Sequence, residues 1–215
     1  MKVRWLGHSA VWIAGSRTIL IDPFLTGNPK AAVRPEEITA LDFLVLTHAH
    51  GDHLGDAYPI AKRTGATVVS LFEVTSEAEK QGIPVEPMNI GGSIVSKGVR
   101  FSMVAAIHTG PVSGMIIEMD GKTVYHMGDT GLLSDMGLLP EFFSIDVAFV
   151  PIGDRFTMGA DSAAKAVALC GAKTAVPIHY GTFPILDATA DRFVEKVGGR
   201  AKVRVLRPGE ELAVG

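Results

Sequence analysis

The chain lacks the features that direct a protein out of the cell or into a membrane. It has 1 cysteine among 215 residues, so no internal disulfide can form and a reducing compartment is expected. The apolar stretches near the start are short and are interrupted by His8, Ser9 and Ser16, unlike a signal peptide or a membrane-spanning helix. We therefore predict a cytoplasmic protein with no membrane-bound part.

Strong charge is also missing. The net charge is −3, charged residues make up 20% of the chain, and no run of Lys or Arg occurs. Because nucleic acid binding depends on dense positive charge, the expected partner is a small molecule rather than DNA or RNA. Cys170 ends an alanine-rich helical pattern, where we expect a buried apolar residue rather than a nucleophile.

The apolar pattern predicts one domain over residues 1–215, because no Gly-, Ser- or Pro-rich linker divides the chain. Strands are predicted at 2–6, 10–14, 18–21, 43–46 and 67–70, with helices at 57–63 and 73–81. Further strands are predicted at 93–96, 99–106, 114–119, 123–127, 147–151, 173–178 and 202–206, with helices at 162–169 and 188–197. This order predicts two similar halves that divide near Gly98, with two sheets in an α/β or α+β protein.

The densest group of chemically active residues lies between positions 47 and 53. It reads Thr47-His48-Ala49-His50-Gly51-Asp52-His53 and follows a strand-like run directly. Imidazole is the commonest metal ligand of proteins, and a carboxylate can complete a divalent-metal site. A tight glycine-containing loop after a strand can turn these side chains toward one point, so the segment predicts a metal site.

Four more polar residues follow predicted strands: His8, His108, Asp129 and His179. Polar groups at strand ends are how sheets with helices on their faces build their sites. Taken singly, each histidine is better explained by a structural hydrogen bond than by a metal, because an isolated histidine carries little specificity.

Taken in order, the cluster and these strand-end residues resemble the metallo-β-lactamase superfamily over essentially the whole chain. Within it, several strings resemble the small metal-dependent hydrolases related to L-ascorbate-6-phosphate lactonase. These strings are Leu6-Gly7-His8-Ser9, Leu20-Ile21-Asp22-Pro23-Phe24, Tyr125-His126-Met127-Gly128-Asp129-Thr130-Gly131, Phe156-Thr157-Met158-Gly159 and Pro177-Ile178-His179-Tyr180-Gly181-Thr182. One string departs from the family pattern: the usual Pro-Ile-Gly-Gly reads Pro151-Ile152-Gly153-Asp154. The resemblance implies an α+β fold, a four-layer αββα sandwich.

The resemblance also implies two metal ions. The first would be held by His48, His50 and His108, the second by Asp52, His53 and His179, and Asp129 would bridge them. Such a set leaves a coordination position for water, as a catalytic site requires. No cysteine belongs to the set, so Zn²⁺ is expected first and Mn²⁺ second, with Fe, Co and Ni also compatible.

The activity expected from such a site is hydrolysis by a hydroxide held between the two ions. The substrate would be a small ester, lactone or phosphoester, with an anionic group as one option. The predicted catalytic residues are Asp52, which would ligate and orient the hydroxide, and His8, which would protonate the leaving group, bind substrate or hydrogen-bond a ligand. Phosphodiester cleavage of a nucleotide or RNA, and a metal-binding module without catalysis, remain the alternatives.

Other predictions concern the surroundings of the ions. Asp22 is expected to orient a ligand histidine, and His126 to face the core or support a ligand. Backbone amides of a helical segment starting at Thr130 and Gly131, and of Thr109 and Gly110 after His108, could receive a phosphate or carboxylate. Arg155 is expected either to bind an anionic substrate or to be a solvated surface residue. Assembly into a homo-oligomer is left open by the sequence.

Overall fold

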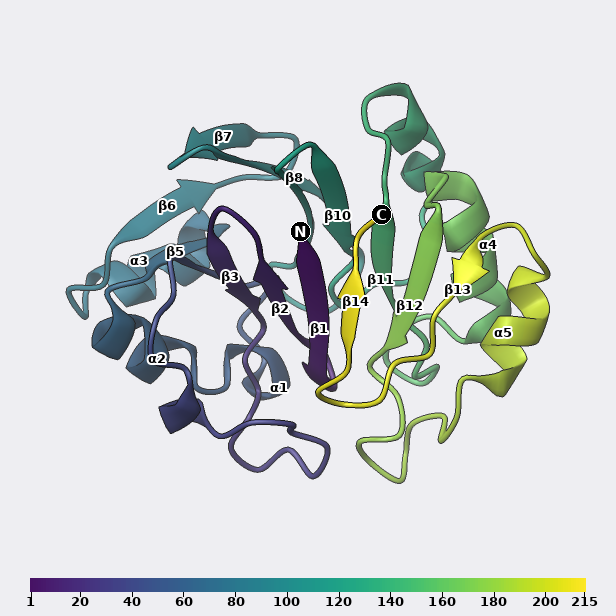
Figure 1. Cartoon of the computed structure of the whole chain (residues 1–215), viewed down its shortest axis with the longest axis horizontal. Coiled ribbons are helices and arrows are strands. Elements are labelled where there is room, and N and C mark those ends of the chain that lie inside the picture. Colours follow the sequence, from purple (N-terminus) through teal and green to yellow (C-terminus); the bar gives the residue numbers. More distant parts are fainter.

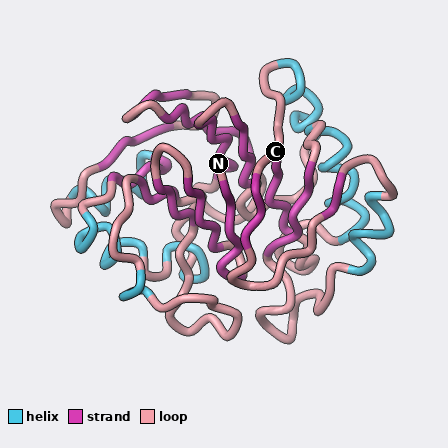
Figure 2. Tube along the Cα trace, in the orientation of Figure 1, coloured by secondary structure: helices cyan, strands magenta, loops and turns pink.

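The computed structural model describes all 215 residues as two seven-stranded sheets that face each other between outer helices (Figures 1 and 2). The first sheet has the order β14-β1-β2-β3-β4-β5-β6. Its strands are β1 (Lys2–Gly7), β2 (Ala10–Ala14), β3 (Thr18–Ile21), β4 (Phe43–Val45), β5 (Thr67–Leu71), β6 (Val85–Met88) and β14 (Glu211–Ala213). The second sheet has the order β13-β12-β11-β10-β9-β8-β7. Its strands are β7 (Ser93–Ser96), β8 (Val99–Ala105), β9 (Ser113–Met119), β10 (Lys122–His126), β11 (Val147–Pro151), β12 (Thr174–Ile178) and β13 (Lys202–Val203).

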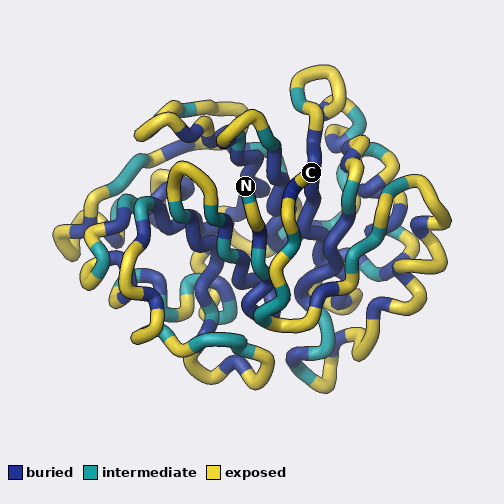
Figure 3. Tube along the Cα trace, in the orientation of Figure 1, coloured by how far each residue is buried: buried dark blue, intermediate teal, exposed yellow.

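Helices cover the outer face of each sheet, which completes the predicted four-layer sandwich. The α-helices are α1 (Gly51–Leu54), α2 (Ala57–Thr64), α3 (Phe72–Glu79), α4 (Ala160–Cys170) and α5 (Asp191–Val197), and the 3₁₀ helices are η1 (Pro35–Glu37) and η2 (Ser134–Glu141). The central strands β4 and β11 are buried along their whole length (Figure 3), as strands covered on both faces must be. No helix of the structure combines the length and the apolarity that crossing a bilayer requires.

The division between the halves lies earlier than predicted. The first half ends with β6 at Met88 and the second sheet begins with β7 at Ser93. Gly98, the predicted boundary, lies in the hairpin between β7 and β8, where Lys97 and Gly98 both have positive φ. The glycine serves a tight turn inside the second sheet rather than a connection between halves.

Two strands, β6 and β14, were not predicted from the sequence. Strand β14 returns from the end of the second half to the first sheet, where it pairs antiparallel to β1 with Lys2 opposite Ala213 (Figure 1). It has only three residues, and Val214 beside it is buried in the core. A strand from the end of the chain therefore completes the sheet of the first half.

The strand directions bring the predicted site residues to one edge. Strands β3, β4 and β5 run parallel in the first sheet, and β10, β11 and β12 run parallel in the second. Strand β8 runs in the same direction as β10, because each is antiparallel to β9. The loops after β4, β8, β10 and β12 therefore open where the carboxyl ends of strands meet, the usual place for a site.

Candidate metal centre

The loop after β4 is anchored to both halves. Thr47 donates its backbone N–H to Asp22 (2.9 Å) and accepts at its carbonyl from the Ser113 N–H (3.0 Å). His48 forms an isolated bridge with Val112, next to β9. His50 then precedes the single helical turn α1, which contains Asp52 and His53. The short turn projects the Asp52 and His53 side chains from one segment toward the same region.

The second half contributes one residue from each of three loops. His108 follows β8, Asp129 follows β10, and His179 follows β12. Gly128 has φ of +64°, and a Cβ there would lie 2.7 Å from the Ser113 carbonyl oxygen and 3.0 Å from Thr47 Cβ. Only glycine lets the Asp129 loop pack this closely against the Thr47 loop.

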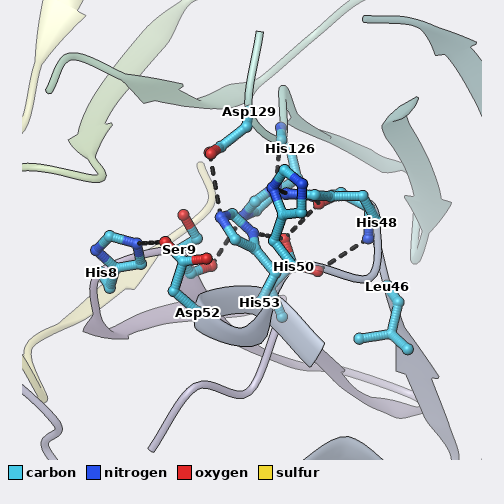
Figure 4. A network of polar contacts seen from close by, with 12 residues as sticks. His8, Ser9, Leu46, His48, His50, Asp52, His53, His126 and Asp129 are labelled. Atoms are coloured by element: carbon cyan, nitrogen blue, oxygen red, sulfur yellow. Dashed lines mark hydrogen bonds and ion pairs between the residues drawn. The ribbon is translucent and has the colours of Figure 1, made fainter. Parts of the chain in front are cut away.

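The seven residues predicted as ligands lie together, and Figure 4 shows five of them, His48, His50, Asp52, His53 and Asp129. The ligating atoms of His48, His50 and His108 form one group, and those of Asp52, His53 and His179 form another together with His8, each group within 4.8 Å. The Asp129 carboxylate lies between them. Its Oδ1 is 3.2 Å from His53 Nε2, and its Oδ2 is 3.1 Å from His179 Nε2 and 3.6 Å from His108 Nε2. This is the position the bridging prediction requires.

The buried polar atoms at the centre fit a bound cation. His53 Nε2, Asp129 Oδ1 and His179 Nε2 are sealed from solvent and make no hydrogen bond of good geometry, although the two nitrogens lie 3.2 and 3.1 Å from the Asp129 carboxylate. Buried polar atoms are normally paired, so unpaired ones call for an explanation such as an absent ion. Imidazole nitrogens and a carboxylate oxygen converging without hydrogen bonds are a donor set suited to Zn²⁺ or Mn²⁺. The residues present therefore fit a metal.

Asp22 contacts His53 on the side of the ring away from Asp129. It is fully buried, accepts from the Thr47 hydroxyl (2.7 Å), and lies 2.7 Å from His53 Nδ1. Burial opposes ionisation, but the nearby His53 keeps the pKa of Asp22 below its ordinary value. Burial likewise opposes charge on His53, yet Asp129 and Asp22 hold its pKa well above the ordinary value. Asp22 fixes the His53 ring so that Nε2 faces Asp129, the arrangement predicted for it.

Thr47 was not singled out from the sequence. Its hydroxyl lies 2.9 Å from His48 Nδ1 as well as bonding Asp22. Because a hydroxyl has one proton and Asp22 accepts it, His48 Nδ1 donates to the Thr47 oxygen and leaves Nε2 free for a metal. Burial lowers the pKa of His48 to about 3, so the ring is neutral. The only sequence signal for this role was the place of Thr47 immediately before the histidine cluster.

His8 contacts the second group from the opposite side. Its ring is fully buried, with Nε2 3.2 Å from Asp52 Oδ2 and Nδ1 2.9 Å from the Thr182 hydroxyl. Burial lowers the pKa of His8 to about 4. Burial alone would raise the pKa of Asp52, but the hydrogen bond with His8 acts against it, and the pKa of Asp52 lies below its ordinary value. Thr182, which the sequence reading did not single out, lies in the string that also contains His179.

His126 joins the two halves beneath the centre. It is fully buried, its Nε2 lies 2.9 Å from the Ser9 carbonyl oxygen, and its Nδ1 accepts from the Gly128 N–H at 3.2 Å. Since Nδ1 accepts, Nε2 carries the proton and donates to Ser9. The ring therefore connects the loop of His8 with the loop of Asp129, in keeping with its predicted core position.

The helix start predicted at Thr130 and Gly131 is not formed, and the Gly131 amide is not available to an anion. The Gly131 N–H donates to the Ile107 carbonyl (3.0 Å), and η2 begins only at Ser134. Neither a helix start nor a free Gly131 amide exists there. Arg155 is exposed, and its guanidinium lies over the Phe156 ring, 5.8 Å from the centroid.

Asp154, the residue at which the chain departs from the Pro-Ile-Gly-Gly pattern of the family, has φ of +65° in a tight turn. Asp154 N–H donates to Met158, and the Asp154 carbonyl accepts from Thr157. This backbone conformation favours glycine, which the family pattern has there, and aspartate is among the few other residues that adopt it readily. The departure therefore changes a side chain at the surface without changing the turn.

A cavity of about 360 Å³ adjoins His48 and His50. Tyr58, Glu73 and Glu77 form part of its wall, with Thr109 and Gly110 on the side of His108. The Glu73 carboxylate has no ion-pair partner, whereas Glu77 pairs with Lys80. The space next to the candidate centre is therefore small and bordered by negative charge.

The fold and this cluster define a metal-dependent hydrolase of the β-lactamase superfamily. The model of the β-lactamase superfamily domain matches residues 17–180. The chain belongs to the UPF0173 metal-dependent hydrolases within that superfamily, as its similarity to their members shows. It is 48% identical to one from Pyrococcus abyssi, over 99% of both chains, and 43% identical to one from Pelotomaculum thermopropionicum, again over 99% of both. Among solved structures, the metallo hydrolase Igni18 of Ignicoccus hospitalis has a TM-score of 0.92 and 38% identity, covering 98% of this chain and 97% of that one.

Proposed function

We propose that the protein holds two divalent ions, Zn²⁺ ahead of Mn²⁺, and hydrolyses a small neutral ester or lactone. The observation that carries this proposal is the set of sealed, unpaired atoms on His53, Asp129 and His179. His48, His50 and His108 would hold one ion, Asp52, His53 and His179 the other, and Asp129 would contact both. When bound, the ions would lower the pKa of water toward neutrality and so supply the nucleophile.

The chain's own residues prepare this site. Asp22 and Thr47 fix the tautomers and orientations of His53 and His48. The neutral His8 ring donates from Nε2 to Asp52 Oδ2, provided that the Thr182 hydroxyl donates to Nδ1. His8 thereby holds the Asp52 carboxylate in one orientation. Of the roles predicted for His8, this geometry favours the hydrogen bond to a ligand over proton donation to the leaving group.

The cavity beside His48 and His50 guides the choice of substrate. Its volume of about 360 Å³ is near the lower end of small-molecule sites. Glu73, the carboxylate in its wall without an ion-pair partner, would repel a phosphate or carboxylate group. We therefore place neutral esters and lactones ahead of the phosphoesters and anionic substrates that the sequence also allowed. The net charge of −3 and the small volume of this cavity also argue against a strand of RNA as the substrate.

The proposed location is the cytoplasm. The one cysteine, Cys170, is free and buried, so the fold does not depend on an oxidising compartment. Burial raises the pKa of its thiol to about 11, which suits the predicted packing role rather than nucleophilic chemistry.

The test combines metal analysis with a substrate panel. The purified protein, loaded with Zn²⁺ or Mn²⁺, is analysed by plasma mass spectrometry and assayed with p-nitrophenyl acetate, a γ-lactone and bis-p-nitrophenyl phosphate. We expect two ions per chain and turnover of the ester and lactone. Asp52→Ala should lower kcat/KM by about 10²–10³-fold or more, whereas Asp135→Ala, on the exposed side of η2, serves as the matched control and should retain activity.

Two results would contradict the proposal. Stoichiometric metal without turnover of any compound would overturn the substrate class, and full activity of Asp52→Ala would overturn the role of its carboxylate. A preference for bis-p-nitrophenyl phosphate would favour phosphodiester cleavage. The double variant Glu73→Gln/Glu77→Gln sharpens the choice, because removing wall charge should improve anionic substrates more than neutral ones.

A further inference from the structure

A larger cavity lies apart from the metal centre, on the outer face of the second sheet. Its volume is about 630 Å³, within the range of small-molecule sites. Val104 of β8 lines one side, and Met136, Leu139 and Phe143 line the other, in and after η2. Figure 1 shows the η2 segment as the green loop and coil at the upper right. None of the seven predicted metal ligands lines this cavity.

An unpaired phenol lies in the wall of this cavity. Tyr125 of β10 lines it, and only 1% of the residue is exposed. Its hydroxyl takes part in none of the side-chain hydrogen bonds of the structure, whereas the Tyr58 hydroxyl donates to the Val74 carbonyl. The hydroxyl is also absent from the atoms that are both sealed from solvent and unpaired, so it reaches the cavity, where a ligand oxygen can accept from it.

The one cation beside the cavity is compensated. Arg100 is paired with Glu118 at 3.4 Å, and Asp135 adds a further negative group. The Ser93 and Ser102 hydroxyls bond each other at 2.8 Å. No uncompensated cation is therefore available for an anionic ligand, and the wall is otherwise mostly apolar.

We propose that this cavity binds an uncharged, largely apolar small molecule with a carbonyl or ether oxygen that accepts from the Tyr125 hydroxyl. The apolar wall would bury the body of the ligand, and the phenol would fix its orientation. The site is independent of the metal centre and of the hydrolysis proposed there. A competing occupant is a second copy of this chain, because Leu138 and Phe142 are 54% and 75% exposed beside the cavity.

The probe for the experiment is prodan, an uncharged naphthalene ketone whose emission reports polarity and hydrogen bonding. We expect saturable binding at one site of the full-length protein. Tyr125→Phe keeps the ring but removes the hydroxyl, so it should weaken prodan binding by roughly tenfold and shift the bound emission to shorter wavelength. Tyr58→Phe is the matched control and should leave both unchanged. Ester hydrolysis by Tyr125→Phe should equal that of the wild type, which shows that the variant is folded.

A second variant tests the cavity itself. Val104→Trp places a large ring in the space and should abolish prodan binding, while circular dichroism verifies the fold. Equal affinity and emission for the wild type and Tyr125→Phe would overturn the proposal. So would a wild-type dimer in sedimentation that binds prodan only after Phe142→Asp separates it, since the occupant would then be a second copy.

Discussion

The two halves of the molecule share one hydrogen-bonding arrangement, here called the strand joint, in which an aspartate before the middle of three parallel strands binds both neighbouring strands. They differ in how they supply the predicted metal ligands. In the first half Asp42, just before β4, accepts from the Thr18 N–H at 2.9 Å, and its carbonyl accepts from Thr67 at 3.1 Å. In the second half Asp146, just before β11, accepts from the Thr123 N–H at 2.9 Å, and its carbonyl accepts from Thr174 at 3.1 Å. The same local chemistry therefore starts the same three parallel strands twice.

The loops at the other end of these strands have diverged. The first half supplies four predicted ligands from the single loop after β4, and the second half supplies one from each of three loops. Asp22 and Met127 show the divergence most directly. Their N–H groups make equivalent bonds, to Val45 (3.0 Å) and to Phe149 (3.1 Å). Only the first half places a carboxylate there, and that carboxylate orients His53.

The largest effect should come from removing one ligand in each half. His50→Ala and His179→Ala should each lower kcat/KM by about 10²–10³-fold or more, because the nucleophile and its position both depend on the ions. If the assignment to two sites is right, each variant should lose one ion and keep most of the other. Metal analysis of both proteins distinguishes this outcome from loss of both ions together, which would indicate one shared site.

A smaller loss of metal affinity is expected at Asp22, the residue that contacts His53 and has no carboxylate counterpart in the second half. Asp22→Asn should weaken metal binding by about 10- to 100-fold, because the amide is a poorer acceptor for the proton on His53 Nδ1. Met127→Leu, at the equivalent position of the second half, is the control and should change binding less than about twofold. Competition with a chelator measures both. An unchanged affinity for Asp22→Asn would show that His53 needs no such partner.

The shared joint predicts matched losses of stability. Asp42→Ala and Asp146→Ala should each lower the free energy of unfolding by about 1–3 kcal/mol, since each leaves a strand amide without its acceptor. Burial opposes ionisation of Asp146, but Lys173 and the Thr123 amide keep its pKa below the ordinary 3.8. Its contribution is therefore present above about pH 4 and lost as the pH falls through the folded pKa.

Urea unfolding at several pH values measures this effect. The difference between wild type and Asp146→Ala should be full at pH 7 and should shrink below about pH 4. A difference that grows toward acid pH would mean that the carboxylate is not the stabilising form.

The smallest effect concerns the exposed ion pair that joins β14 to β1. Lys2 and Glu211 lie 3.4 Å apart with side chains 62% and 51% exposed. Glu211→Gln should change the free energy of unfolding by less than about 0.5 kcal/mol, because such pairs are well solvated. Thermal unfolding would detect a larger loss, which would mean that this edge depends on charge.

Much of this arrangement was readable from the sequence because its signals are local. The histidine cluster and most strands carry their patterns within a few residues, and the family resemblance supplied the order of His108, Asp129 and His179. Strand β14 could not be predicted, because its three residues show no clear alternation and its partner β1 lies at the other end of the chain. Thr182 was missed for a related reason, since a threonine gains its role only through His8, 174 positions away.

The position of β14 also has a consequence for the order of events during synthesis. Pairing Lys2 with Ala213 joins segments separated by nearly the whole chain, and such contacts form slowly. Until residue 211 leaves the ribosome, the outer edge of β1 is an unpaired template that other chains can join. Strand β14 therefore covers this edge of β1, and nascent chains in which it has not yet paired are exposed to edge-to-edge association.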